Sequence, residues 1–160
     1  MIVNMLSLVE IQEECAELQA FRDLLVEYQS FLGVDLCFQQ FEKELKDPLG
    51  KYTPPRGIVL LGYQDGPICA CGALQDLGEN ICEIKRIYVK PDFRRQGIAR
   101  SISEYLLARA TEIGYEKARL DTLRRLTGAV PLYQSLGFTE IAPYNFNPEE
   151  DIVYMELALT

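Results

Sequence analysis

The chain has 160 residues, of which 48% are hydrophobic and 25% charged, so we predict a single domain over residues 1–160. A net charge of −8 argues against a nucleic-acid partner, because such affinity comes mainly from a broad basic surface that neutralises phosphates. The absence of histidine excludes Ser–His and Cys–His catalytic pairs and histidine-based zinc sites, and we expect no metal.

Neither a targeting signal nor a cysteine motif in the sequence indicates a particular function. Apolar runs such as residues 58–61 are too short to cross a bilayer, and residues 1–4 lack the basic start of an export signal. We therefore expect a cytoplasmic protein with no membrane partner. No CxxC spacing occurs among the cysteines, which we interpret as reduced, mostly buried thiols: Cys15, Cys37, Cys69, Cys71 and Cys82.

The first third of the chain predicts one strand and two helices. Residues 2–9 resemble a strand, and residues 11–32 repeat apolar side chains at helical spacing, with Gly33 placed to end the helix. Asp35 is placed to cap a second helix over residues 36–45, and residues 47–57 are typical of a loop.

The remaining elements predict the fold class. Three antiparallel strands are expected at residues 57–63, 68–77 and 81–89, followed by a helix at 98–113 and a strand at 117–123. A short helix at 128–136 and strands at 138–142 and 152–159 complete the chain. The strand–helix–strand unit over 81–123 should be a right-handed parallel crossover. The prediction is an α/β fold with a mixed, predominantly antiparallel sheet, one parallel strand–helix–strand crossover, and helices on both faces.

The turn over residues 94–100 is the most informative segment. It joins a predicted strand to a predicted helix, so several main-chain N–H groups lack helical partners there and the helix dipole adds positive charge. Between residues 85 and 100 there is one acid, Asp92, against six cations: Lys85, Arg86, Lys90, Arg94, Arg95 and Arg100. The segment predicts a site for a phosphate or pyrophosphate rather than merely a solvated basic loop. A kinase-type P-loop is disfavoured, because no Gly-Lys-Ser/Thr follows Gly97.

Two motifs resemble those of the GCN5-related N-acetyltransferase (GNAT) family, whose members move an acetyl group from acetyl-coenzyme A (acetyl-CoA) to an amine. The family turn Arg/Gln-x-x-Gly-x-Gly/Ala is matched by Arg94-x-x-Gly97-x-Ala99. Downstream, residues 129–138 (AVPLYQSLGF) resemble the family pattern A-x-x-L-Y-x-x-x-G-F. The resemblance spans residues 58–159.

The resemblance implies a cofactor site. Main-chain groups of Ile87 and Val89 would pair with the pantetheine arm, and the N–H of Val89 would polarise the thioester carbonyl. Main-chain amides from Arg95 to Arg100 would hold the pyrophosphate, with Arg94 and Arg100 supplying charge. The complete set of expected acetyl-CoA contacts is Ile87, Tyr88, Val89, Arg94, Arg95, Gln96, Gly97, Ile98, Ala99, Arg100 and Ser101.

Two catalytic roles are also implied by the resemblance. Tyr133 matches the tyrosine that protonates the departing thiolate, and Glu83 matches a glutamate that serves as general base in some members. The chemistry agrees: an alkyl amine with a pKa of about 10.4 must lose a proton before it attacks, and without histidine a carboxylate or a chain of waters must accept it. Strict strand alternation places Glu83 on the same face as Ile87 and Val89, unless a bulge intervenes. Each residue could instead be structural, Glu83 as an outward strand residue and Tyr133 as a packing residue.

Two positions depart from the family pattern. Leu126 stands where many relatives carry an asparagine, and Pro131 suits a helix only within its first turn. We expect the acceptor pocket to be lined by a mixed aromatic and acidic set: Tyr28, Phe38, Tyr52, Asp121, Thr122, Tyr144 and Phe146.

The leading hypothesis is an acetyl-CoA-dependent N-acetyltransferase acting on a primary amine. The acidic composition, including residues 149–151 (EED), favours a small cationic metabolite as acceptor. Two alternatives stay open: acetylation of a protein lysine or N-terminus, and a non-catalytic module that senses acetyl-CoA. The sequence leaves the oligomeric state open, a homodimer included.

Overall fold

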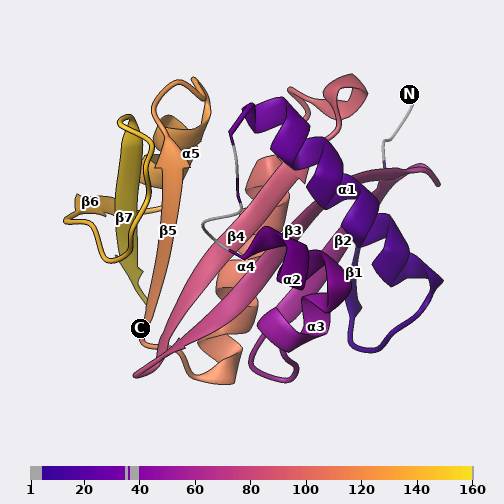
Figure 1. Ribbon diagram of the computed structural model, residues 1–160, viewed down its shortest axis with the longest axis horizontal. Coiled ribbons are helices and arrows are strands. Elements are labelled where there is room, and N and C mark those ends of the chain that lie inside the picture. Colours follow the sequence, from indigo (N-terminus) through magenta and orange to yellow (C-terminus); the bar gives the residue numbers. More distant parts are fainter. Residues whose placement is uncertain (1–4, 35, 37–39, 160) are drawn as a thin grey trace.

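A seven-stranded sheet forms the centre of the molecule (Figure 1). The structure, a computed structural model, describes residues 5–34, 36 and 40–159. In spatial order the strands are β1 (Leu6–Ile11), β2 (Ile58–Gln64), β3 (Ile68–Gly78), β4 (Ile81–Val89), β5 (Lys117–Leu123), β7 (Ile152–Ala158) and β6 (Thr139–Ile141). Every neighbouring pair is antiparallel except β4 and β5, which are parallel. The predicted mixed sheet with one parallel crossover is therefore confirmed.

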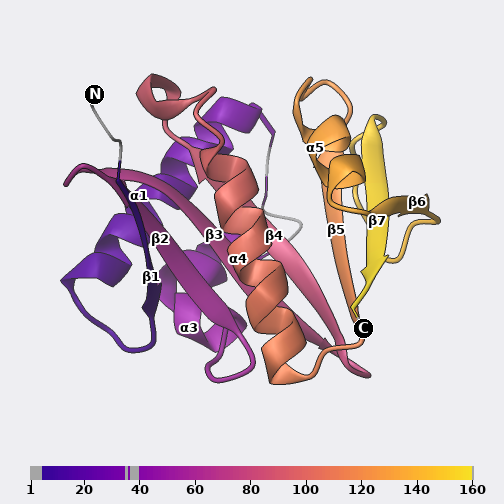
Figure 2. The same cartoon turned by 180° about the vertical axis from the view of Figure 1, so that it is seen from behind.

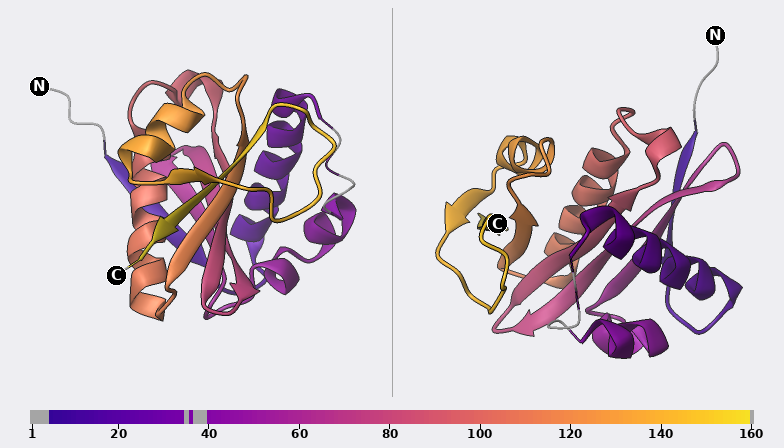
Figure 3. Two further views of the ribbon diagram at one scale, coloured as in Figure 1. Left: turned by 90° about the vertical axis from the view of Figure 1, so that its left-hand side faces the viewer. Right: turned by 45° about the horizontal axis from the view of Figure 1, so that its top comes forward.

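Helices cover both faces of the sheet, as predicted. On one face lie α1 (Ala16–Leu32), α2 (Phe41–Lys46) and α3 (Pro48–Lys51), and on the other lie α4 (Ile98–Ile113) and α5 (Ala129–Ser135) (Figures 2 and 3). In the part of the chain that the structure describes, no helix combines the length and apolar character needed to span a membrane.

Each helical layer packs against its own apolar core. On the α4 side, Ile102 and Leu106 are fully buried against strand residues such as Leu74. On the α1 side, Phe21 and Leu25 are fully buried with residues of β2 and β3. Burying one such side chain stabilises the fold by roughly 1.5–3 kcal/mol, so the spacing of apolar residues determines which helix face meets the sheet.

Three local predictions need correction or lie outside the described residues. The first helix begins at Ala16 rather than at residue 11, because β1 extends to Ile11. Residues 48–51, expected in a loop, form the one-turn helix α3, since the Asp47 carboxylate accepts a hydrogen bond from the Gly50 N–H at 3.1 Å. Residues 2–4 of the predicted opening strand, and the predicted cap Asp35, lie outside the described residues.

Other boundaries follow the sequence pattern closely. Helix α1 ends at the left-handed Gly33 (φ +68°), and α4 and β5 span the predicted residues. Helix α5 begins at Ala129, which places Pro131 in its first turn, the one part of a helix that tolerates proline well.

Two irregularities of β4 create the site. Pairing between β4 and β5 stops at Glu83 and Arg119, after which the two strands diverge (Figure 1). Against β3, a bulge places two β4 residues, Arg86 and Ile87, opposite the single residue Gly72, and Arg86 adopts φ +61°. A side chain at Gly72 would approach the Ile102 Cγ2 atom to 2.7 Å, so the backbone can sit this close to α4 only with glycine there.

Candidate active site

The bulge at Arg86 reverses the alternation of side chains along β4. Ile87 and Val89 pack against the core on the α4 side, whereas Tyr88 belongs to the core on the α1 side. Cys82 and Ile84 also belong to the α4-side core, so Glu83 between them faces the α1 side. The prediction that Glu83 shares a face with Ile87 and Val89 is therefore wrong, because the extra residue shifts the pattern by one.

A cavity of about 360 Å³, here called the turn cleft, lies between the end of β4, the start of α4 and α5. Most predicted acetyl-CoA contacts line it. The lining residues are Phe31, Ile87, Tyr88, Val89, Phe93, Arg94, Arg95, Gly97, Ile98, Ala99, Arg100, Gly128, Ala129, Leu132 and Tyr133.

Main-chain donors at the start of α4 remain available to a ligand in the turn cleft. The first hydrogen bond of the helix runs from the Ser101 N–H to the Gly97 carbonyl at 3.0 Å, so the amides before residue 101 are not used by the helix. Gly97 adopts φ +77°, a conformation that favours glycine, and the first turn of α4 holds no acidic residue. This end of α4 therefore presents unopposed positive potential to the cleft.

Arg94 lines the turn cleft, and two contacts hold its side chain in place. Its Nε atom donates to the Val89 carbonyl at 3.0 Å, and its guanidinium lies 4.3 Å from the Phe31 ring centroid. Its buried Nη2 atom has no hydrogen-bond partner among the described residues. A buried donor without a partner is unfavourable, so the site suits an incoming anionic or carbonyl oxygen. The pyrophosphate and amide carbonyls of an acyl-CoA would fit that requirement.

Two of the predicted contacts do not line the cleft. The Gln96 side chain accepts a hydrogen bond from Gln64 at 2.7 Å, and the Ser101 hydroxyl donates to the Gly97 carbonyl at 3.1 Å. Arg100 lines the cleft but is also held there, because it donates to the Ser135 hydroxyl at 2.8 Å. The turn thus offers mainly its backbone and Arg94.

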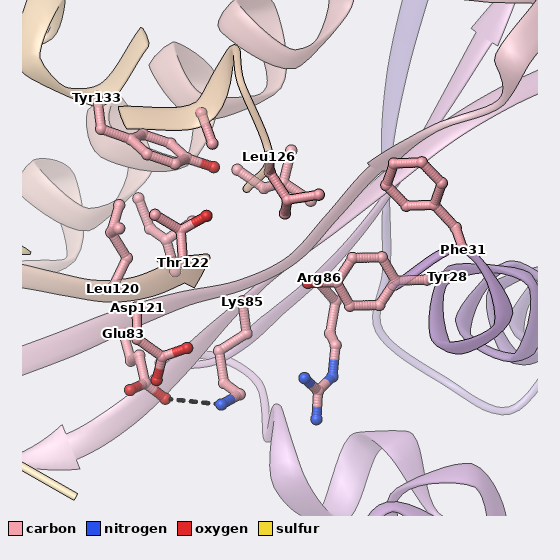
Figure 4. A pocket seen from close by; sticks show the side chains of 13 residues that line it. Tyr28, Phe31, Glu83, Lys85, Arg86, Leu120, Asp121, Thr122, Leu126 and Tyr133 are labelled. Carbon is pink, nitrogen blue, oxygen red and sulfur yellow. Dashed lines mark ion pairs between the residues drawn. The ribbon is translucent and has the colours of Figure 1, made fainter. Parts of the chain in front are cut away.

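A second cavity, the central pocket, occupies the gap where β4 and β5 diverge (Figure 4). Its volume is about 90 Å³. The lining residues come from both faces of the sheet, so the pocket passes between the strands: Tyr28, Phe31, Glu83, Ile84, Lys85, Arg86, Ile87, Leu120, Asp121, Thr122, Leu126, Ala129 and Tyr133. Four residues line both cavities, so the turn cleft and the central pocket meet at their side chains: Phe31, Ile87, Ala129 and Tyr133.

Glu83 is buried on one side of the central pocket, with an exposed fraction of 3%. One carboxylate oxygen accepts a hydrogen bond from the Tyr144 hydroxyl at 2.6 Å, and the other lies 3.3 Å from the Lys85 Nζ atom (Figure 4 draws this ion pair). Burial, reinforced by the Glu83 charge, raises the pKa of Tyr144, so this phenol stays protonated as the donor.

Asp121 projects from β5 toward the same group of charges. Figure 4 shows its carboxylate beside the carboxylate of Glu83 and the ammonium of Lys85. Burial raises the pKa of Asp121; the Lys85 charge opposes this shift and the Glu83 charge adds to it. The central pocket therefore holds two carboxylates in different surroundings.

Tyr133 reaches the junction of the two cavities from α5. Its ring packs against Phe138, with centroids 5.9 Å apart. Burial raises the pKa of Tyr133, so the phenol carries its proton at neutral pH. Within the described residues, no group accepts a hydrogen bond from this hydroxyl, which leaves it available to a ligand.

A buried ion network on the α1 side was missed by the sequence reasoning. Glu44 of α2 accepts two hydrogen bonds from Arg86, at 3.0 and 2.8 Å, one from Lys51 at 3.1 Å and one from the Tyr52 hydroxyl at 2.9 Å. Burial alone would raise the pKa of Glu44, but Arg86 and Lys51 outweigh it and lower the pKa to about 2. The sequence did hold one signal that Glu44 faces inward: it lies three residues after Phe41, which is buried on the inner face of α2.

The predicted acceptor-lining residues divide into three groups. Tyr28, Asp121 and Thr122 line the central pocket. Tyr144 contributes through its hydrogen bond to Glu83. Two further predictions do not line the pocket: Tyr52 is buried in the α1-side core and Phe146 is exposed. The prediction for Phe38 is not tested, because this residue lies outside the described residues.

Comparisons with known proteins decide the family. A family model described as the acetyltransferase (GNAT) family matches residues 18–138. The chain belongs to the GNAT acetyltransferase family. An uncharacterized N-acetyltransferase of Schizosaccharomyces pombe is 37% identical to this GNAT protein over 146 residues, covering 90% of each chain.

Two further relatives bear on structure and substrate. A Klebsiella pneumoniae structure, described as a candidate acyl-CoA N-acyltransferase, has a TM-score of 0.74 and 25% identity, covering 98% of this chain and 99% of its own. The ribosomal protein bS18 alanine N-acetyltransferase of Escherichia coli is 33% identical over 79 residues, covering 46% of this chain and 53% of its own. This GNAT protein is accordingly an acyltransferase enzyme of the type that uses an acyl-CoA and acts on amines.

Proposed function

We propose that this GNAT protein transfers the acetyl group of acetyl-CoA to the primary amine of a small cationic molecule. The observation that carries the proposal is the junction of the two cavities. A cleft rich in main-chain donors meets, at Tyr133, a narrow pocket that contains two carboxylates. The first suits a diphosphate and the second an ammonium group.

Acetyl-CoA would supply an acetyl thioester, whose carbonyl carbon forms a bond to the amine nitrogen as its bond to sulfur breaks. On the protein side, residues 95–100 and Arg94 hold the phosphates, and Ile87 and Val89 on the open edge of β4 align the pantetheine arm. The Val89 N–H polarises the thioester carbonyl, and an N–H fixed in place stabilises the negative charge that develops there.

Proton transfer is assigned to the side chains of the central pocket. A carboxylate, with Glu83 as the residue indicated by the family pattern, receives the proton of the amine. Tyr133 protonates the sulfur, a role supported by its position between the cavities and by the raised pKa that keeps its proton in place.

The size of the central pocket supports a slender acceptor. A volume of about 90 Å³ admits an amine on a short or unbranched chain rather than a bulky ring. A second candidate is the N-terminus or lysine of a protein, favoured by the similarity to the bS18 alanine N-acetyltransferase. Such an acceptor would also present a single amine on a narrow arm.

The test combines calorimetry with acetyl transfer to a panel of diamines, amino compounds and peptides. The wild type should bind CoA and acetylate small cationic amines, and Tyr133→Phe should lose on the order of 100-fold in kcat while its CoA affinity is unchanged. Tyr105→Phe is the matched control, because Tyr105 lies on α4 and hydrogen-bonds Glu10 away from both cavities. CoA binding without turnover on any acceptor would identify a sensor instead, and turnover on peptides alone would favour the protein substrate.

A further inference from the structure

The contacts of Glu83 make it a poor acceptor of a substrate proton. Its two oxygens are engaged by Tyr144 at 2.6 Å and by Lys85 at 3.3 Å. The side chain has an exposed fraction of 4%, so an amine that arrives from outside meets other groups first. A general base must come within hydrogen-bond reach of the proton it removes, and these contacts obstruct that approach.

Asp121 occupies the more accessible position. Glu83 and Arg119 form the last pair of the β4–β5 ladder, and two residues farther along each strand lie Lys85 and Asp121, which face each other across the gap on the same side of the sheet. The half-buried Asp121 lines the central pocket. It also lines a smaller cavity of about 40 Å³, the side pocket, bounded by the end of α1 and by residues 147–152.

The oxygens of Asp121 are also less occupied than those of Glu83. Within the described residues, the Asn145 side-chain amide donates a hydrogen bond to one Asp121 oxygen at a long 3.4 Å. The Lys85 ammonium forms its ion pair with Glu83 and acts on Asp121 through its charge. Asp121 can therefore accept a hydrogen bond from a ligand in the central pocket.

We infer that Asp121 is the carboxylate that removes the proton from the acceptor amine, and that Glu83 is a positioning residue that holds Lys85 and Tyr144 around it. This inference rests on the proposed function and assigns its proton acceptor. It differs from the expectation that the β4 glutamate acts directly.

The surroundings of Asp121 suit the role. Its charged and titratable neighbours come from several elements: Glu83, Lys85 and Arg86 on β4, Tyr133 on α5, Tyr144 and Glu149 on the loop before β7, Tyr154 on β7 and Tyr28 on α1. Burial and Glu83 raise the pKa of Asp121 against the opposing charge of Lys85. A carboxylate with a raised pKa accepts a proton from an ammonium group more readily than an ordinary one.

Asp121 and Tyr133 account for every proton that moves in the proposed reaction. The acceptor binds as an ammonium ion, and Asp121 takes one proton to give the neutral amine. The nitrogen then forms its bond to the acetyl carbon, and the electron pair of the breaking carbon–sulfur bond passes to sulfur. Tyr133 protonates that sulfur and recovers the second proton of the nitrogen, and Asp121 releases its proton to solvent through the side pocket.

Two isosteric variants, Asp121→Asn and Glu83→Gln, test the assignment through the dependence of kcat/KM on pH. In the wild type, kcat/KM should rise with pH as Asp121 loses its proton, which gives the pH profile an acidic limb. Asp121→Asn should lower kcat/KM by about 100-fold or more and abolish that acidic limb. Glu83→Gln should keep the limb and move it to lower pH, because removing a neighbouring negative charge lowers the pKa of Asp121. CoA affinity, measured by calorimetry, should match the wild type in both variants.

A carbon-detected NMR titration of the free protein gives a readout that needs no turnover. The Asp121 carboxyl should titrate above the ordinary aspartate range, and its titration should move down in Glu83→Gln. If the wild type acetylates amines but the acidic limb survives in Asp121→Asn and disappears in Glu83→Gln, the assignment of Asp121 is wrong. The proposed function would stand in that case. A wild type that binds CoA but acetylates no amine would overturn the proposed function and, with it, this assignment.

Discussion

The two sides of the candidate site are built in different ways. The turn cleft depends on one continuous segment, residues 94–100, whose main-chain donors point outward because a helix starts there. The central pocket depends on side chains from α1, β4, β5 and α5, with the loop before β7 behind them, brought together by the sheet. One side can be recognised from a short motif, whereas the other exists only after the fold has formed.

The two sides also differ in how their polar groups are satisfied. In the turn cleft, the amides of residues 95–100 and the Nη2 atom of Arg94 have no partner among the described residues. Beside the central pocket, Glu44 pairs with Arg86 and Glu83 pairs with Lys85. A ligand should therefore add stability mainly on the turn side, while mutation should remove stability mainly on the side of the ion network.

The largest expected effect is on stability, from Glu44→Gln. This change leaves the guanidinium of Arg86, whose side chain is 3% exposed, without its counter-charge. Breaking such a buried pair costs about 3–5 kcal/mol, which urea unfolding would measure. The matched control is Glu14→Gln, which breaks the pair between the exposed Glu14 and the half-buried Arg22 and should cost less than about 1 kcal/mol. Equal losses in the two variants would contradict the importance assigned to the buried network.

The same network gives a pH dependence with a definite sign. The pKa of Glu44 is lowered to about 2 from an ordinary value near 4.5. A carboxyl group with a depressed folded-state pKa contributes stability that is present above its unfolded-state pKa and is lost as the pH falls through its folded-state pKa. The wild type should therefore lose this contribution between about pH 4.5 and pH 2, and Glu44→Gln should lose less over that range.

Much of the turn side could be predicted because its causes are local. Gly97, the basic run and the following apolar helix are contiguous, and the structure places the start of α4 at the predicted residue. The two exceptions, Gln96 and Ser101, have side chains held by Gln64 and by the Gly97 carbonyl. A motif specifies the backbone of such a turn, but the direction of each side chain depends on neighbours distant in sequence.

The pocket side was less predictable because one residue changes its register. The bulge at Arg86 moves Ile87 and Val89 to the opposite face from Glu83, and strand alternation alone gives no sign of where a bulge falls. The sequence signal nearest to the bulge is Gly72 in the neighbouring strand, since a glycine within a strand often marks a bulge. Glu44 and Arg86 are 42 positions apart, so the helical spacing that turns Glu44 inward gives no sign of its partner.

A smaller effect, confined to the turn side, is expected from Gly97→Val. A β-branched residue at φ +77° is strained by roughly 1–2 kcal/mol, and its side chain enters the turn cleft, where a phosphate would lie. Loss of one charge-assisted hydrogen bond corresponds to about 10- to 100-fold weaker CoA binding by calorimetry. Gly114→Val, at the other end of α4 with φ +109°, is the control: it should lower stability but not CoA affinity. Comparable weakening in both variants would indicate a general effect of strain.

The smallest effect is expected from Arg125→Met, at the outer end of the pocket side. Arg125 pairs with Asp151 at 2.7 Å and with Glu149 at 3.3 Å, and Glu149 lines the side pocket. Loss of these exposed pairs should cost less than about 1 kcal/mol of stability, while the freed carboxylates should lower KM for a cationic acceptor by about two- to threefold at low salt. Because salt screens exposed charges, the gain should fade as ionic strength rises. Arg124→Met, which breaks the neighbouring pair with Glu140, should leave KM unchanged, since Glu140 lines none of the cavities described above. A lower KM in both variants, or weaker CoA binding in either, would mean that the two sides are not independent.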